Sequence, residues 1–317
     1  MGVSSLHTLY AVDVDPITEA NAVFIDGISD FAVAPGVQEV LLGGNGQVDP
    51  RYVAHMGSMP GISFTTTKLG TLLAEISNAF LISGTKIDSD PTHDGLEVFF
   101  QAMVEGGTRA GATSHIKLTI NEGLLVPRGL NVAQNTIARL ALELVITYDG
   151  TNDPIVLATS QSLIGTPDVS EAFTLGPISI NGTPLVSTQS LNIDPGIQLT
   201  VQSGDGDKWP TFVGIMQRQP MITINTLDVS LLSTYGIMGT AISASDVILY
   251  LRKMAEGGTR VADATAEHVK ITLDEGIIRV APIAGAHGGL LGTQIIIRPT
   301  YDGANAILVI DPASAIT

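Results

Sequence analysis

The sequence predicts a mainly β protein built from two tandem, similar units, each a β-sandwich or partial barrel with a short flanking α-helix. Two observations lead to this prediction. Apolar and polar residues alternate through much of each half, which is the period of a β-strand. Short segments of the first half also return in the same order in the second, so the halves should share a fold. The chain has 317 residues, of which 44% are hydrophobic, enough for a real core.

The internal repeat sets the predicted domain boundaries. The repeated segments keep their order and nearly their spacing: EGGTR at 105–109 and 256–260, HIKLTINEG at 115–123 with HVKITLDEG at 268–276, and TYDG at 147–150 and 300–303. Weaker matches pair 34–53 with 194–213 and 60–73 with 220–232. We therefore predict a first unit over 1–160, a linker over 161–176 and a second unit over 177–317. The linker is rich in glycine, proline and small polar residues.

Several strands can be predicted individually. LEVFFQAMV (96–104) and HIKLTI (115–120) alternate, and a long glycine-rich loop between them is typical of an antiparallel hairpin. In the second strand the alternation places Ile116 in the core and His115 on the outer side. The segment 137–150 would also suit a helix, but its counterpart 292–303 is β-branched and contains a proline, so both are predicted as strands.

One short helix is predicted in each unit. Over 67–78, four apolar residues recur at helical spacing, and Thr67 stands where a capping residue would. They are Leu69, Leu72, Leu73 and Ile76. The counterpart is the segment 227–236, which ends at a glycine suited to a C-terminal cap.

Charge and cysteine content exclude several function classes. Acidic residues number 31 against 15 basic ones, for a net charge of −16, so a basic groove that grips nucleic acid is not expected. The chain has no cysteine, which excludes disulfides, thiol nucleophiles and cysteine-ligated metals. No apolar run approaches the 18 or so residues of a membrane helix, and no secretory signal is evident at the N-terminus.

The candidate motifs for catalysis or metal binding are weak, and a purely structural interpretation is favoured for each of them. Six histidines are scattered without metal-ligand spacing. Asp88, Asp90 and Asp94 share the segment 86–95 but lack the spacing of a calcium loop, so a solvated loop is predicted. The Gly-x-Gly pairs at 44–46 and 204–206 are typical of hairpin turns. We therefore predict no enzyme activity, catalytic residue, metal, cofactor or small-molecule substrate; a hydrolase on a β-scaffold would need a paired acid or a triad.

The order of elements resembles a known family. In each unit, strands precede a Pro-x-Ile-x-(Phe/Ile)-x-Thr segment (60–66 and 220–226), followed by a short helix, a long hairpin and further strands. This resembles the major tail protein, or tail tube protein, of long-tailed bacteriophages. The resemblance implies a β-sandwich with a flanking helix, whose long strands join between subunits into an inner barrel. It implies a structural virion protein, assembled in the host cytoplasm, that forms stacked rings in the tail through which DNA leaves the particle.

The same resemblance implies partners and an assembly state. Two fused units imply a homotrimer that forms a pseudohexameric ring. The partners would be further copies of the chain, other phage tail proteins and DNA in transient, non-specific passage, with no membrane and no small molecule. A net negative conduit would repel phosphates rather than bind them.

Two sets of residues are predicted to serve this assembly. The first is the pair of glycine-rich loops that are best retained between the units, predicted as ring contacts: Glu105, Gly106, Gly107 and Arg109, and Glu256, Gly257, Gly258 and Arg260. Glycine geometry alone is the alternative reason for their retention. The second is a set of acids predicted to face the lumen: Glu97, Glu122, Glu143, Asp274 and Glu275.

Two alternatives to the tail tube stay open at this stage. Another phage structural part, such as a distal tail protein or a capsid decoration protein, would share the composition. A non-catalytic β-sandwich binding or adhesin module would need export and usually exposed aromatic residues, and only 5% of the residues are aromatic, with Trp209 the one tryptophan.

Overall fold

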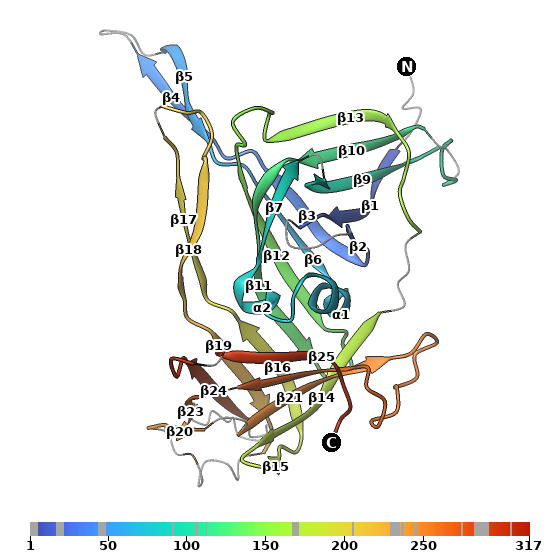
Figure 1. Ribbon diagram of the computed structural model, residues 1–317, viewed down its shortest axis with the longest axis vertical. Coiled ribbons are helices and arrows are strands. Elements are labelled where there is room, and N and C mark those ends of the chain that lie inside the picture. Colours follow the sequence, from blue (N-terminus) through green and yellow to red (C-terminus); the bar gives the residue numbers. More distant parts are fainter. Residues whose placement is uncertain are drawn as a thin grey trace.

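The structure is a computed structural model, and it confirms the mainly β prediction. The described residues are 6–16, 22–43, 49–90, 92–104, 107–111, 113–166, 171–204, 206–228, 235, 238–243, 246–273, 275–281, 292–304 and 306–317. They form several antiparallel sheets that pack in layers, with short helices near the middle of the molecule (Figure 1). Each of these sheets has open edges, and none closes into a barrel within the described residues.

One five-stranded sheet belongs to the first half of the chain. Its order is β13-β10-β9-β1-β2. The strands are β1 (Leu6–Val14), β2 (Val23–Ile25), β9 (Leu96–Met103), β10 (His115–Ile120) and β13 (Ile155–Gln161). The predicted hairpin of 96–104 and 115–120 is confirmed by the antiparallel pairing of β9 with β10.

The second half forms a five-stranded sheet with an equivalent order, β25-β22-β21-β14-β15. Its strands are β14 (Ala172–Ile180), β15 (Thr183–Pro184), β21 (Val247–Met254), β22 (His268–Leu273) and β25 (Leu308–Ser314). Because β14 starts at Ala172, the predicted linker 161–176 already includes the beginning of a strand.

The largest sheet runs through both halves of the molecule. Along its main path the order is β20-β23-β24-β19-β16-β11-β12-β6-β3, with β7 paired to β11 and β8 to β7. The first half supplies β3 (Ile28–Ala34), β6 (Gly61–Thr66), β7 (Thr85–Asp90), β8 (His93–Asp94), β11 (Glu122–Ala133) and β12 (Arg139–Thr147). The second supplies β16 (Thr188–Asp194), β19 (Met221–Thr226), β20 (Thr240–Ile242), β23 (Glu275–Val280) and β24 (Thr293–Thr300). The strand predictions for 137–150 and 292–303 are confirmed by β12 and β24.

Within this sheet the two halves again have the same order. The first contributes β7-β11-β12-β6-β3 and the second β20-β23-β24-β19-β16. A two-stranded hairpin stands at the same place in each half, following β3 or β16. These hairpins are β4 (Val37–Gly43) with β5 (Pro50–Ser58), and β17 (Ile197–Gln202) with β18 (Phe212–Arg218). We call residues 1–160 unit one and residues 177–317 unit two, and we call strands with the same place in the two orders equivalent.

The core is one continuous cluster that extends across both units. Its largest fully buried side chains include Ile25, Phe64 and Phe80, each at most 2% exposed. The four apolar residues of the predicted helix are all in this cluster, which explains their helical spacing.

The helix of unit one is shorter than predicted. It consists of one turn, α1 (Leu69–Thr71), a π-helical turn, η1 (Leu72–Ile76), and a second short helix, α2 (Phe80–Ser83). The capping role predicted for Thr67 is wrong, because Lys68 precedes α1 and no side chain caps it. The hydroxyl of Thr66, one residue earlier, instead accepts the Lys68 backbone N–H at 3.1 Å. Most of the segment 227–236 lies outside the described residues.

Two further predictions are corrected. The segment 86–95 is not a solvated loop but contains most of β7 and all of β8, because Glu122 to Leu125 of β11 pair with β7 and hold it on the sheet. His115 is fully buried rather than outward, because a bulge between His115 and Lys117 shifts its register. Among the described residues, no helix is long and apolar enough to cross a membrane.

Candidate assembly interface

The two units are joined by backbone pairing in the large sheet. β16 of unit two runs antiparallel to the last four residues of β11, with Leu130 opposite Ile193 and Val132 opposite Leu191. These four side chains are at most 3% exposed. On the other face of the sheet, the Asn192 amide donates to the Asn131 side-chain carbonyl. The apolar pairs supply the burial and the backbone pairing fixes the register.

The hairpin β17–β18 then crosses the first unit instead of continuing in the sheet. At its base, the Arg128 guanidinium donates to the Ile197 carbonyl at 2.6 Å and to Glu143 at the same distance. At its tip, the Tyr148 N–H donates to the Pro210 carbonyl, and the Ser58 N–H to the Lys208 carbonyl, both at 2.8 Å. The hairpin therefore runs from β11 at its base to the ends of β12 and β5 at its tip.

An aromatic contact anchors the hairpin tip. The rings of Tyr148 and Trp209 lie 5.1 Å apart between centroids, with the planes tilted by 45°. The Lys208 ammonium stands 4.7 Å from the centre of the Trp209 ring. Below the tip, a cavity of about 430 Å³ separates Phe212 and Val213 from Glu122 and neighbouring residues of β11. The one tryptophan of the chain thus serves contact between the units.

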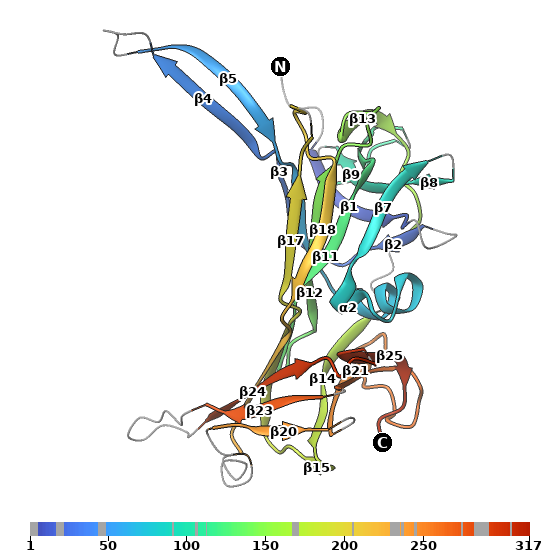
Figure 2. The same cartoon turned by 60° about the vertical axis from the view of Figure 1, so that its left-hand side comes forward.

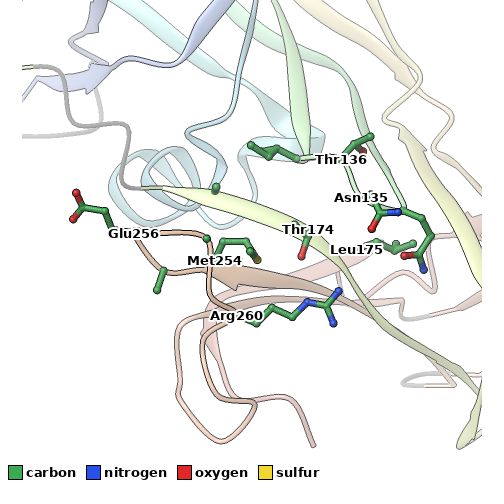
Figure 3. Close-up of a pocket in the computed structure, with 13 residues that line it drawn as sticks. Asn135, Thr136, Thr174, Leu175, Met254, Glu256 and Arg260 are labelled. Carbon is green, nitrogen blue, oxygen red and sulfur yellow. The ribbon is translucent and has the colours of Figure 1, made fainter.

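The second glycine-rich loop lies beside unit one. Glu256, Gly257, Gly258 and Arg260 line a cavity of about 500 Å³ together with residues 134–137 of the β11–β12 turn. Figure 3 shows the loop that carries Glu256 and Arg260 on one side of this hollow, and Asn135 and Thr136 on the other. Of the predicted ring-contact loops, this one therefore stands at a boundary between units within the chain.

A glutamate from the connection completes the joint. The Glu171 carboxylate accepts the Thr71 backbone N–H at 3.1 Å and the Thr71 hydroxyl at 2.6 Å. A Cβ at Gly70 would stand only 2.2 Å from this carboxylate, so a side chain there would displace it. Beside it, Phe173 is 2% exposed, and its carbonyl accepts the Ala138 N–H at 2.7 Å. We refer to all these contacts between the units as the inter-unit joint.

The two EGGTR loops fold in the same way where both are described. Met103 bridges to Arg109, and Met254 to Arg260, at equivalent places. The buried imidazoles of His115 and His268 support these loops, because their Nδ1 atoms accept the backbone N–H groups of Ala102 and Lys253 at 3.0 Å. This local architecture accounts for retention of the loops without an intermolecular role. Glu105 and Gly106 lie outside the described residues, and a ring contact through Gly107 and Arg109 stays a prediction.

The acids predicted to line a lumen are distributed over two sheets. Glu97 is on β9, where it pairs with Lys117. Glu122, Glu143 and Glu275 are on the large sheet, and Asp274 lies outside the described residues. Glu122 stands 3.5 Å from Lys86, and burial raises its pKa above the usual value although this lysine opposes the shift. Three of these acids thus have basic partners that reduce the field they project, while Glu275 is exposed.

Within the described part of the chain, no three His, Cys, Asp or Glu side chains are grouped so as to hold a metal ion. The aspartates of 86–95 are used locally: Asp90 accepts from the Thr92 hydroxyl and N–H at 2.6 and 2.7 Å, and these bonds lower its pKa to about 2. The inter-unit joint is the most extensively built candidate site, and only part of it was predictable from the sequence. The pairing of β11 with β16 was not predicted, because the alternation of apolar and polar residues along a strand does not specify which strand it pairs with.

Comparisons with known proteins add no family to this description. The sequence matches no protein-family model. A search of curated proteins likewise returned no match.

Proposed function

We propose that this chain is a structural virion protein that closes into homotrimeric, pseudohexameric rings, and that these rings stack into the tail tube of a long-tailed phage. One observation carries the proposal: the inter-unit joint is head-to-tail. It places β16, the edge strand of unit two, against β11, at the other side of unit one. Contacts between unlike surfaces propagate until a ring closes or a filament forms.

The open end of the sheet supports further propagation. β3 holds in unit one the place that β16 holds in unit two, and within the described residues it is the last strand of the large sheet. By the same rule, β3 would pair with the strand of a second copy that is equivalent to β11, which is β23 of unit two. An exposed edge of this kind favours pairing with another chain.

Charge is compatible with a conduit for DNA. Each chain carries a net charge of −16, and a ring of three would carry three times that. Repulsion between such a wall and the phosphates of DNA favours passage over binding. The copy number of three follows from the family resemblance and is part of the proposal.

The test is to image the purified protein by negative-stain electron microscopy and to measure its mass in solution. We expect hollow, near-sixfold rings, some stacked into tubes, and a ring mass about three times the chain mass of 33.0 kDa. Rings that never stack would favour another phage structural part, such as a distal tail or decoration protein. A monomer at all concentrations, even with tail-initiating proteins added, would contradict the proposal.

A further inference from the structure

We propose that the hairpin β4–β5 of one copy docks on the β23–β24 face of unit two in a second copy, as β17–β18 docks on β11–β12 within the chain. This inference rests on the proposed head-to-tail ring. It assigns the contact between copies to two surfaces, the β4–β5 hairpin and the β23–β24 face, which no hairpin covers within the single chain. Their equivalents, β17–β18 and β11–β12, contact each other.

The two hairpins leave the sheet in the same way. Gly36 precedes β4 and Gly196 precedes β17, with φ of 58° and 59°. Met59 N–H donates to the Gly36 carbonyl at 3.0 Å, and Gln219 N–H to the Gly196 carbonyl at 3.1 Å. A Cβ at either glycine would lie within about 2 Å of that neighbouring backbone, so the exit geometry requires glycine at both places. The hairpins are thus equivalent elements with different surroundings.

The β4–β5 hairpin is apolar but uncovered. Figure 2 shows it projecting away from the rest of the molecule, whereas β17–β18 lies along unit one. The following large hydrophobic side chains on it are between 40% and 65% exposed: Val37, Val40, Leu41, Leu42, Tyr52, Val53 and Met56. A two-stranded hairpin is marginal in water by itself, and an apolar patch of this extent is typical of an interaction surface.

The β23–β24 face is the uncovered counterpart of the face beneath β17–β18. Glu122 pairs with Thr147 in unit one, as Glu275 pairs with Thr300 in unit two. Thr147 is 2% exposed, whereas Thr300 is exposed. Ile277, two residues after Glu275, is 51% exposed. An apolar residue thus stands open on unit two at a position that the hairpin partly shields in unit one.

A hollow marks the expected seat of the hairpin tip. Within the chain, the tip contacts Tyr148 and Ser58, whose equivalents in unit two are Tyr301 and Arg218. These two residues line one cavity of about 580 Å³, together with residues of β18 and with Ala79, Ile82 and Ser83 in and before α2 of unit one. Tyr301 is 62% exposed there. The vacant equivalent of the tip contact is therefore already a concave site.

Charge supports a second copy as the occupant of that hollow. The tip residues Trp209 and Pro210 correspond to Asp49 and Pro50 in unit one. Asp49 is exposed, and it would enter a cavity that is lined by the exposed Arg218. The aromatic contact of the inter-unit joint would be replaced by an acid–base contact between copies, which gives specificity to the encounter.

Disulfide trapping tests the contact directly, because the chain has no cysteine of its own. The matched control is Tyr148→Cys with Pro210→Cys, whose backbones are hydrogen-bonded at 2.8 Å, close enough for a disulfide. The test pair is Tyr301→Cys with Pro50→Cys. After oxidation we expect the control to remain a single chain, and the test pair to run as covalent dimers and trimers on a non-reducing gel.

A charge reversal gives a second measure that does not depend on disulfide geometry. Asp49→Arg should raise the protein concentration needed for half-maximal ring formation by about tenfold, equivalent to about 1.4 kcal/mol. Arg218→Asp in the same chain should restore assembly. Both residues are exposed, so neither substitution should prevent folding.

The outcomes separate this inference from the proposed function. Rings in the microscope, with a test pair that stays monomeric while the control pair oxidises, would overturn the docking of β4–β5 and leave the ring intact. Absence of both rings and intermolecular disulfides would overturn both proposals. If the control pair itself fails to oxidise, an Asp49→Arg variant that assembles normally would overturn the docking.

Discussion

Equivalent strands of the two units contribute to the core in the same way, but the elements that cover them differ. Ile193 on β16 is fully buried against β11, whereas Val33, at the same place on β3, is 40% exposed. Thr147 is buried beneath the β17–β18 hairpin, whereas Thr300 is open. The units therefore differ chiefly where one meets another. What covers a residue depends on whether its unit has a neighbour on that side.

A second difference lies inside unit one alone. Lys68 and Asp26 form a buried ion pair at 3.3 Å, with side-chain exposures of 11% and 2%. The corresponding positions of unit two hold Asp228 and Val186. The surrounding frame is shared, because Thr66 and Thr226 donate to the carbonyls of residues 26 and 186 at 3.0 and 2.9 Å. The shared backbone frame thus surrounds a buried ion pair in unit one, whereas Val186, at the position of Asp26, is 59% exposed in unit two.

The largest effect is expected from a charge placed in the inter-unit joint at β16, compared with the same change at the open edge strand β3. Ile193→Asp places a charge opposite Leu130 in the core and should destabilise the chain by about 4 kcal/mol or more. Val33→Asp, at the open edge, should change the free energy of unfolding by only about 1 kcal/mol but abolish ring formation. Urea unfolding and mass in solution measure the two effects. Equal destabilisation by both substitutions would show that the two edges do not differ in covering.

Removing one member of the buried ion pair comes next. Lys68→Met leaves the Asp26 carboxylate buried without its cation and should cost about 3–5 kcal/mol. Adding Asp26→Val, the residue found at the corresponding position of unit two, should recover most of that loss because the uncompensated charge is gone. The check is the urea midpoint at neutral pH. A double variant as unstable as the single one would rule out an uncompensated charge as the cause.

The same contrast separates what the sequence could predict from what it could not. Alternation identified β9 and β10, because each has one face in the core, whereas β24 was identified by its β-branched residues and proline, and β12 by its equivalence to β24. It placed His115 wrongly, since a bulge reverses the side on which a strand residue lies, and a bulge has no period. β7 was missed because Asp88 and Asp90 are residues typical of a loop, and they lie in a strand only because Asp88 pairs with β11 and Asp90 with β8.

The candidate site was predictable only in part. The repeat of EGGTR indicated two equivalent loops, and one of them does lie at the boundary between units. The pairing of Leu130 with Ile193 joins residues distant in sequence, and neither segment bears a local signature of its partner. The exposure of the β4–β5 hairpin was likewise not predictable, because apolar strand residues such as Leu41 and Leu42 are normally expected in the core.

A pH effect of intermediate size is expected from His115. Burial lowers its pKa below the usual 6.5, and the nearby charges of Arg109 and His7 act in the same direction. As pH falls through 6.5 the unfolded chain takes up a proton before the folded one, so stability should fall from pH 7 to pH 5. His115→Gln should reduce this slope, although it also weakens the bond to Ala102. Urea midpoints at the two pH values test this, and an unchanged slope would exclude His115 as its source.

The smallest expected effect is a gain in stability at Asp13. This residue pairs directly with Glu97 across β1 and β9, whereas the equivalent pair in unit two is Ser179 with Ile248. Burial, then repulsion from Glu97, Asp15 and Asp94, raises the pKa of Asp13 to about 6. The folded chain therefore holds a proton that the unfolded chain has already lost, and stability contributed by this group falls as pH rises from about 4 through about 6.

Replacing that acid with the residue of unit two should remove the penalty. Asp13→Ser is expected to raise the free energy of unfolding at pH 7.5 by about 1–2 kcal/mol, a few degrees in melting temperature, since like charges opposite each other on neighbouring strands repel. Near pH 4 the gain should vanish, because Asp13 is then protonated in the folded chain. Melting curves at both pH values provide the measurement. A gain of the same size at pH 4 would mean that packing, not charge, distinguishes the two units at this position.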